Sequence, residues 1–380
     1  MHVAMNGWFW DIPNSGSGQY IRRLLQHLLR VDDSLKISLI MPAHNPTPDD
    51  VPEGIEVIAT GKASSTGKLG KVWFEQRTFP RMASKINADI AHVPYWGSAL
   101  SSDVPQVVSV LDVIPLLFPL YAGGFFTRLY TELVTQSASV ADHVISISYT
   151  SQVDIEKLLG IHKDNITVTY LAPDDRYHPR LGIERDEVVR EKYNLPDQFV
   201  LGGMGFDARK QVNELLLGYT YMAPTEGADT PLVLAGKQPD WDNPLFPDLP
   251  EYVRRLELDD YVQWIGYVDE EDKPSLYRLA SVFAFPSEYE GFGLPPLEAM
   301  ACGTPVVAWN SVVADEILED GAYLVETARE LGAAVLSLIL QKPLRETLVN
   351  QGLAQVTKYN WRKTAQDTLL AYQKTLHANR

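Results

Sequence analysis

Residues 285–307 read F-P-S-E-Y-E-G-F-G-L-P-P-L-E-A-M-A-C-G-T-P-V-V. The apolar run 281–285 suits a buried strand, and a loop with two glycines and the carboxylate of Glu290 follows it. Pro296 predicts the first position of a helix, which Gly303 ends before the next strand. A strand, a glycine loop and a helix N-terminus in this order predict an anion site, because free backbone N–H groups and the helix dipole face the same point.

Length and charge limit the class of protein. A chain of 380 residues is longer than one hydrophobic core usually supports, which predicts two domains. The formal net charge of −16 argues against a nucleic-acid partner. Cys302 is the single cysteine, so we expect a reducing cytoplasm and a buried packing role for this thiol. We find no signal peptide and no apolar stretch long enough for a membrane span, so any membrane contact is expected to be peripheral.

An α/β pattern occurs twice along the chain. The first half has the turn P-N-S-G-S-G at 13–18 before an amphipathic helix at 19–30, and strands are predicted at 2–9, 36–41, 54–59, 89–94, 106–111, 143–148 and 166–170. In the second half, strands are predicted at 199–204, 232–235, 262–265, 281–285 and 322–325. We therefore predict an α/β fold with two Rossmann-like, doubly wound domains, residues 1–172 and 182–358, a linker at 173–181 and a terminal helix within 359–380.

The segment 62–85 is basic in an otherwise acidic chain. Its cations are Lys62, Lys68, Lys71, Arg77, Arg81 and Lys85, and its one acid is Glu75. We predict a loop in its first half, which is rich in Gly, Ser and Thr. The segment is either an ordinary solvated surface or a contact for an anionic acceptor or membrane. The run 121–126, with Phe125 and Phe126, is either core or an apolar lip for a lipid or sugar.

Charged residues follow two predicted strands of the second half. Arg209 and Lys210 lie in the loop after strand 199–204, where two cations can meet a diphosphate, although a solvated surface pair is the alternative. Glu298 is predicted in the first turn of its helix, where a carboxylate is favoured and can bind sugar hydroxyls. Glu290 lies in the loop itself, nearer to a reacting group.

Other polar residues are weaker candidates. Asp112 follows strand 106–111, at a strand end where α/β sheets place their chemistry. His92 is expected to be packed and hydrogen-bonded rather than catalytic. Residues 240–242 spell D-W-D, a spacing of two carboxylates that can bind a metal ion, but they lie in a proline- and acid-rich loop, and we predict no metal there.

The stretch 285–307 strongly resembles the signature of the retaining glycosyltransferases of family 4, which have the GT-B fold. The resemblance covers most of the chain. G-F-D-A-R-K at 205–210 resembles the family's diphosphate-binding loop. G-S-G at 16–18 with Tyr20 resembles its N-terminal glycine turn, and N-W at 360–361 resembles the start of its last helix, which returns to the N-terminal domain. The resemblance implies two domains that face each other across a cleft. D-V-I-P-L-L-F-P at 112–119 resembles the mannosyltransferase branch, which implies GDP-mannose as donor.

The resemblance implies a cytoplasmic enzyme that transfers a hexose, with retention and without a metal or other cofactor, from a nucleotide diphosphate sugar. The acceptor would be a hydroxyl of a glycan or a lipid-linked glycan, and we expect peripheral contact with the inner face of an anionic membrane. By position, Arg209 and Lys210 would bind the diphosphate and stabilise the leaving group, Glu290 would contact the sugar, and Glu298 the ribose. The donor residues implied are Gly16, Ser17, Gly18, Gly205, Arg209, Lys210, Tyr267, Glu290, Gly291, Phe292, Gly293, Leu294 and Glu298, and the catalytic ones are Glu290, Asp112, Arg209 and Lys210.

One position departs from the family pattern. Many relatives have His-Asp where this chain has Leu111 and Asp112, and leucine can neither donate a hydrogen bond nor carry a charge. Asp112 stays a candidate polar group. The departure leaves two alternatives open: a nucleotide-sugar-binding protein without transferase activity, and a GT-B epimerase or hydrolase.

Overall fold

The computed structural model describes residues 1–42, 50–60 and 67–378, so the predicted contact of Lys62 and the start of the predicted loop at 61–66 lie outside the described residues. The chain divides into two compact units. The first consists of Met1–Leu171 and Asn360–Arg380, and the second of Ala172–Tyr359. Within the described residues, no helix is both long and apolar enough to cross a bilayer.

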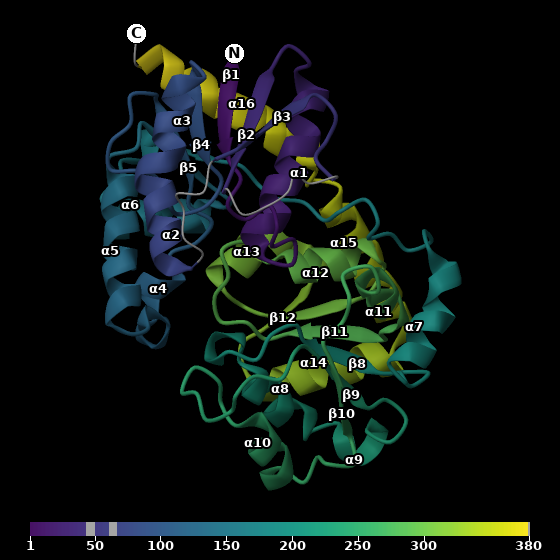
Figure 1. The fold of residues 1–380 in the computed structure, drawn as a ribbon. Coiled ribbons are helices and arrows are strands. Elements are labelled where there is room, and N and C mark those ends of the chain that lie inside the picture. Colours follow the sequence, from purple (N-terminus) through teal and green to yellow (C-terminus); the bar gives the residue numbers. More distant parts are fainter. Residues whose placement is uncertain (43–49, 61–66, 379–380) are drawn as a thin grey trace. The chain divides into compact units, whose positions relative to one another are not determined.

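The first unit contains a parallel sheet which, in the described part of the chain, has seven strands in the order β3-β2-β1-β4-β5-β6-β7 (Figure 1). The strands are β1 His2–Asn6, β2 Lys36–Met41, β3 Ile55–Ala59, β4 Ile90–Val93, β5 Gln106–Ser109, β6 His143–Ser146 and β7 Ile166–Val168. The helices are α1 Gly16–Val31, α2 Lys68–Trp73, α3 Phe79–Lys85, α4 Ile114–Leu117, α5 Phe125–Ser139, α6 Tyr149–Leu159 and α16 Trp361–Ala378, with 3₁₀ turns at Pro119–Ala122 and Lys163–Asn165. The expected strands are confirmed, with shorter ends.

Helix α1 begins three residues earlier than predicted. The Ser15 side chain caps it by accepting a hydrogen bond from the Gly18 backbone N–H at 3.0 Å, so residues 16–18 form its first turn and not a loop before it. A Cβ on Gly18 would lie 2.0 Å from the Ile12 carbonyl oxygen, so glycine is required here by close backbone packing. Helix α6 is capped in the same way by Ser148, whose hydroxyl accepts a hydrogen bond from the Ser151 backbone N–H at 2.9 Å.

The C-terminal helix α16 belongs to the first unit and packs along α1 (Figure 1). Its buried Tyr372 hydroxyl lies 2.6 Å from His92 Nδ1, and His92 Nε2 lies 2.9 Å from the Ser109 hydroxyl. Ser109 in turn lies 3.1 Å from the Tyr20 hydroxyl of α1. Burial lowers the pKa of His92 to about 3, so the ring is neutral. The predicted return of the last helix and the packed role of His92 are both confirmed.

The described part of the basic segment is helical, which corrects the predicted loop from Lys68 onward. Helices α2 and α3 are joined by a π-helical segment, Phe74–Thr78. Glu75 within it is buried, with its Oε1 3.5 Å from Lys71 Nζ. The Tyr130 hydroxyl of α5 donates to both Glu75 oxygens at 2.9 and 3.0 Å. Residues 68–85 contain only one glycine, one serine and one threonine, so the composition on which the loop prediction rested belongs to residues 61–67.

Glu75 gives the folding stability a pH dependence. Burial raises the pKa of Glu75 to about 7 from its ordinary value of 4.5, although Lys71 and Tyr130 oppose the rise. A raised pKa means that the folded state binds the proton more tightly. The contribution of Glu75 to the free energy of unfolding is therefore fully present below pH 4.5, and it is lost as the pH rises through 7. We expect the free energy of unfolding to fall by about 3 kcal/mol over this range because of Glu75. Urea unfolding at pH 4.5 and 8 should show this fall, and Glu75→Gln should remove it; parallel pH curves for the two proteins would contradict the expectation.

The second unit contains a parallel sheet of six described strands in the order β10-β9-β8-β11-β12-β13. The strands are β8 Val200–Gly203, β9 Leu232–Ala235, β10 Val262–Gly266, β11 Val282–Phe285, β12 Val306–Trp309 and β13 Tyr323–Val325. The helices are α7 Asp186–Lys192, α8 Val212–Tyr219, α9 Ala223–Glu226, α10 Leu249–Arg255, α11 Lys273–Leu279, α12 Leu294–Ala301, α13 Val312–Leu318, α14 Ala328–Leu340 and α15 Lys342–Val356, with 3₁₀ turns at Ile183–Arg185, Ala208–Lys210 and Glu319–Gly321. Aliphatic residues of β8, β9, α8 and α14 form its core.

The segment predicted as a linker, 173–181, lies at the start of the second unit. The Arg278 guanidinium holds it by donating to the His178 carbonyl oxygen at 3.2 Å and to Asp186 Oδ1 at 2.5 Å. Three polypeptide segments therefore meet at one buried arginine side chain, which fixes the path of the chain into this unit.

Candidate active site

The candidate site lies where the strand order of the second sheet reverses. Strands β8 and β11 are neighbours, but β9 and β10 extend the sheet on one side and β12 and β13 on the other. In open α/β sheets, ligands bind outside the carboxyl ends of the strands at such a point. The loop after β8 carries Arg209 and Lys210, and the loop after β11 carries Glu290.

Both cations contact one oxygen of Glu290. Oε1 of Glu290 lies 2.8 Å from Arg209 Nη1 and 2.5 Å from Lys210 Nζ, and it accepts a hydrogen bond from the Ser287 hydroxyl at 2.8 Å. Arg209 also donates to the Tyr289 carbonyl oxygen. The structure thus brings together the three charged residues that the sequence predicted for the diphosphate and the sugar.

The charges set the protonation state of this cluster. Burial acts to raise the pKa of Glu290, but the ion pairs with Lys210 and Arg209 outweigh it and hold the pKa below its ordinary value. Glu290 is therefore ionised at neutral pH. Asp207 also lies against Arg209, with its Oδ1 3.5 Å from Nε, so two carboxylates face the two cations. The guanidinium and ammonium groups remain the donors that an anionic ligand can meet here.

The helix start beside Glu290 differs from the prediction. Helix α12 begins at Leu294 after Gly293, which has φ +94°, so Pro296 is its third residue and not its first. Of the four backbone N–H groups that a helix start leaves unbonded, Pro295 and Pro296 supply none. The donors at this end are those of Gly293 and Leu294. The positive φ favours glycine at 293, although no atom lies within 4 Å of the position its Cβ would take.

Glu298 lies in the second turn of α12, one turn later than predicted, because the helix starts earlier. The Tyr277 hydroxyl donates to its Oε2 at 3.2 Å. Burial raises the pKa of Glu298, and nearby Glu270 adds to the rise while Lys273 opposes it. The tyrosine therefore holds this carboxylate in place on α12.

The remaining donor residues predicted in this unit differ in backbone conformation and in exposure. Gly205 has φ +137°, a conformation that only glycine adopts readily, and it precedes the turn that carries Arg209. Tyr267 follows Gly266 at the end of β10, and its side chain is about half exposed. Gly291 and Phe292 are buried, and the Phe292 ring packs edge-on against Tyr359 at 5.7 Å, so Phe292 can offer a ligand only its backbone.

Two family profiles match the chain. The profile described as "Glycosyltransferase Family 4" matches residues 14–176, and "Glycosyl transferases group 1" matches residues 189–355. Together they cover the greater part of both units. The chain is a family 4 glycosyltransferase. It is an enzyme, a hexosyltransferase.

Curated relatives include two mannosyltransferases. The glycosyltransferase is 28% identical over 377 residues to "O-antigen chain mannosyltransferase B" of Escherichia coli, covering 95% of this chain and 96% of the relative. It is 26% identical to "Serotype-specific mannosyltransferase WbdA" of the same species, over 70% of this chain and 33% of that longer protein.

Solved structures share the GT-B fold. Sucrose-phosphate synthase from Thermosynechococcus elongatus matches with a TM-score of 0.74 at 21% identity, over 100% of both chains. HepE from Anabaena, in complex with UDP and glucose, matches with a TM-score of 0.71 at 19% identity, over 97% of this chain and 98% of HepE. The two Rossmann-like domains predicted from the sequence are confirmed.

The first unit of the glycosyltransferase carries the other predicted site residues. Gly16 and Ser17 lie in the first turn of α1, with open space around the Gly16 Cα. Asp112 follows β5 by three residues and accepts a hydrogen bond from the Ile114 N–H at 3.1 Å. Leu111 beside it is partly buried. These residues lie at the starts of α1 and α4, which agrees with their predicted places after β1 and β5.

Sequence reasoning missed two residues beside Glu290. A small hollow next to Glu290 and Gly293 is also lined by Trp309, at the end of β12, and by Ser311, the cap of α13. The signal was available, because β12 was predicted to follow α12 and carboxyl ends of neighbouring parallel strands lie at one edge of the sheet.

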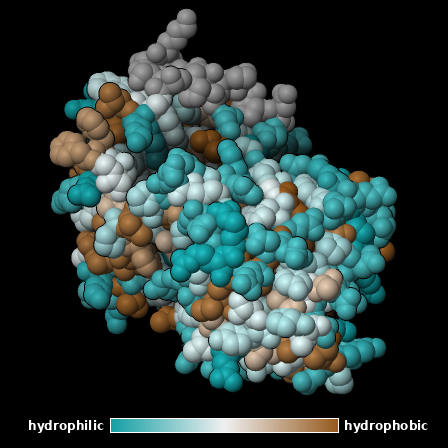
Figure 2. Space-filling view, turned by 90° about the horizontal axis from the view of Figure 1, so that it is seen from below, coloured by the Kyte–Doolittle hydropathy of each residue, from teal (hydrophilic) through white to brown (hydrophobic). Residues whose placement is uncertain are grey.

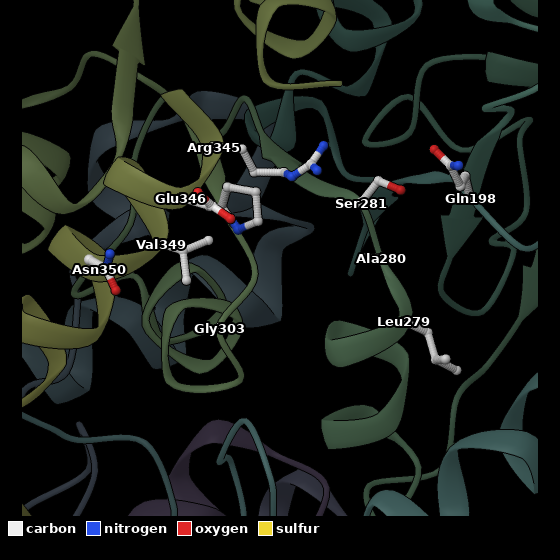
Figure 3. Close-up of a pocket in the computed structure, with 10 residues that line it drawn as sticks. Gln198, Leu279, Ala280, Ser281, Gly303, Arg345, Glu346, Val349 and Asn350 are labelled. Atoms are coloured by element: carbon white, nitrogen blue, oxygen red, sulfur yellow. The ribbon is translucent and has the colours of Figure 1, made fainter. Parts of the chain in front are cut away.

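A larger hollow of about 630 Å³ lies at the opposite edge of this sheet. Gln198, Ser281 and Pro305, which line it, precede β8, β11 and β12, so it opens at the amino ends of the strands. Figure 3 shows Arg345 and Glu346 of α15 extending toward it. It is therefore separate from the charged cluster.

The described residues contain no cluster of three or more His, Cys, Asp or Glu side chains arranged to hold a metal ion. Trp241, the central residue of the D-W-D sequence, packs its ring 5.9 Å from Phe206 and 6.0 Å from Trp264. Cys302 is buried just after α12, and burial raises the pKa of its thiol to about 12, which agrees with the predicted packing role.

Proposed function

We propose that this glycosyltransferase transfers mannose from GDP-mannose, with retention of configuration, to a hydroxyl of a glycan or lipid-linked glycan in polysaccharide biosynthesis. The observation that carries the donor side is the joint contact of Arg209 and Lys210 with Glu290 at the strand-order reversal of the second sheet. Mannose is supported by the names of the curated relatives. We also propose that the enzyme works in the cytoplasm, at the inner face of an anionic membrane.

The proposed chemistry needs charge stabilisation on the leaving diphosphate. As the bond from the sugar to the phosphate breaks, negative charge builds on the phosphate oxygens, and preorganised cations stabilise it. Arg209 and Lys210 can supply this stabilisation without a resident metal, because Glu290, Ser287 and the Tyr289 carbonyl already hold them in place. We propose that the Glu290 carboxylate then contacts hydroxyls of the transferred sugar.

The test is a donor and product analysis on the purified chain. Calorimetric titration with GDP, UDP and ADP should show that GDP binds most tightly. Incubation with GDP-mannose should extend mannose oligosaccharides by α-linked mannose, which NMR of the anomeric proton would identify. A β-linkage would overturn retention, and preferred binding of UDP would overturn the donor. Tight GDP binding without transfer to any acceptor would favour the binding-protein alternative, and release of free mannose or a new sugar nucleotide would favour a hydrolase or epimerase.

Leu111 is the position that bears on the alternatives. We expect Leu111→His, which restores the common His-Asp pair, to leave GDP affinity unchanged and to raise kcat. Leu111→Phe serves as the matched control for a change of volume without a polar group. Equal kcat in both variants would mean that the departure at 111 has no catalytic role.

A further inference from the structure

An apolar groove of about 930 Å³ lies on the first unit, between α2 and α5. Its walls are made by aliphatic and aromatic side chains: Leu69, Val72, Leu100, Phe126, Leu129 and Leu133. The volume is within the roughly 300–1,000 Å³ of typical ligand pockets. Soluble monomers seldom expose a continuous apolar area of this kind without a partner.

The surface around the groove is strongly apolar as well. Leu69 is 82% exposed, and Phe125 and Phe126 at the start of α5 are each 75% exposed. Trp73, Leu116 and Leu120 are exposed nearby in the chain. Figure 2 shows hydrophobic residues gathered on the left of the view, the side on which α4 and α5 lie in Figure 1. Of the two predictions for residues 121–126, the apolar lip fits this exposure and a core does not.

A row of cations continues from this surface along α2 and α3. Leu69, Trp73, Arg77, Arg81 and Lys85 are all exposed and are spaced four residues apart. In an α-helix such a row drifts around the axis, since one turn takes about 3.6 residues. The π-helical segment Phe74–Thr78, closed by i→i+5 bonds, takes more residues per turn and drifts the opposite way. The five side chains therefore stay close to one face, apolar at one end and cationic at the other.

The charge of this face favours an anionic partner. The whole chain carries −16, yet the exposed charges of 68–85 are all positive, because its one acid, Glu75, is buried against Lys71. On the groove itself, one exposed acid of α5, Glu132, stands against Lys68 and Lys71 of α2. Apolar side chains beside Lys and Arg are the composition that binds the interface of an anionic bilayer. A second copy of this chain would bring the same cations together, which costs free energy.

We propose that the groove between α2 and α5, with Phe125, Phe126 and the cationic row, docks on an anionic phospholipid bilayer and takes hydrocarbon from it into the groove. This deepens the membrane location in the proposed function and names the surface that makes the contact. The cations bind lipid phosphates, and the apolar residues replace water with acyl chain. Docking itself requires neither donor nor acceptor.

The test measures binding to vesicles without any nucleotide sugar. The full chain should sediment with vesicles of phosphatidylglycerol and phosphatidylcholine and much less with phosphatidylcholine alone, and salt should weaken the binding. Arg77→Gln with Arg81→Gln should lower the partition coefficient by roughly 10-fold or more, and Phe125→Ser with Phe126→Ser should do the same. Two exposed pairs of the second unit are matched controls: Arg254→Gln with Arg255→Gln, and Val188→Ser with Leu340→Ser.

Trp73 reports whether this surface meets the hydrocarbon. Phospholipids with brominated acyl chains should quench part of the tryptophan fluorescence, and Trp73→Phe should remove that part although seven other tryptophans remain. Three results would each overturn the proposal. The chain could show no preference for anionic vesicles, the variants could bind as well as their controls, or Trp73→Phe could leave the quenching unchanged. A dimer in sedimentation that Phe125→Ser with Phe126→Ser dissociates would assign the surface to a second copy instead. Transfer to a water-soluble acceptor, measured separately, tests the proposed function independently of docking.

Discussion

Arg209→Ala is expected to lower kcat/KM for the nucleotide sugar by roughly 10²–10³-fold, the usual effect of removing one preorganised donor from a developing anion. Arg209 is almost fully buried and contacts Glu290, Ser287 and the Tyr289 carbonyl oxygen. Its charge is therefore already in place before the diphosphate binds. Steady-state kinetics over a range of donor concentrations would measure the loss.

Two comparisons separate this effect from damage to the fold. Arg254→Ala removes an exposed arginine of α10 and should leave kcat/KM unchanged. Arg209→Lys keeps the charge but not the planar, multiple hydrogen bonds, so it should recover only part of the activity. If Arg209→Ala retained kcat/KM within about threefold of the parent while melting normally, the assignment of Arg209 to the leaving diphosphate would be wrong.

Glu290→Gln is expected to separate donor binding from turnover. The substitution keeps the size and the acceptor oxygen but removes the charge that faces Arg209 and Lys210. Because the Glu290 charge no longer offsets Lys210 and Arg209, GDP should bind more tightly, although Asp207 still faces Arg209. Turnover should fall by about 10²-fold or more, since a neutral amide replaces the carboxylate that would contact the sugar. Calorimetry with GDP and single-turnover kinetics would give the two quantities.

Glu288→Gln is the matched control for Glu290→Gln. Its exposed carboxylate lies 2.9 Å from Gln211 Nε2 rather than on the cations, so both GDP affinity and turnover should stay close to the parent values. Weaker GDP binding together with unchanged turnover in Glu290→Gln would mean that Glu290 only supports the loop. Because the pKa of Glu290 lies below its ordinary value, its protonation should not limit the rate near neutral pH.

The sheets and the charged cluster could be predicted because their signals are local. Buried parallel strands are short Val- and Ile-rich runs, and Gly303 and Gly205 mark turns at fixed distances from them. The order of strands then brings Lys210 and Glu290 to one edge of the sheet, although 80 positions separate them along the chain.

The errors came from helix starts and from tertiary contacts. Ser15 was available in the sequence as the cap of α1, whereas α12 starts at Leu294 because Gly293 before it adopts a left-handed conformation. Glu75 reads as a surface acid in a basic segment, and its burial depends on Tyr130 from a distant helix. Such pairings arise when helices pack and leave no pattern in either segment alone.

The return of α16 to the first unit has a consequence for biosynthesis. A ribosome releases the chain from its N-terminus, so residues 1–171 emerge well before Trp361–Ala378 exist. During that interval, the surface of α1 that α16 covers is bare, and His92 lacks Tyr372. The first unit can complete its packing only after the whole second unit has been translated. Any nascent chain that stops before residue 361 therefore lacks the helix that covers α1, and chaperones and proteases can recognise the exposed surface.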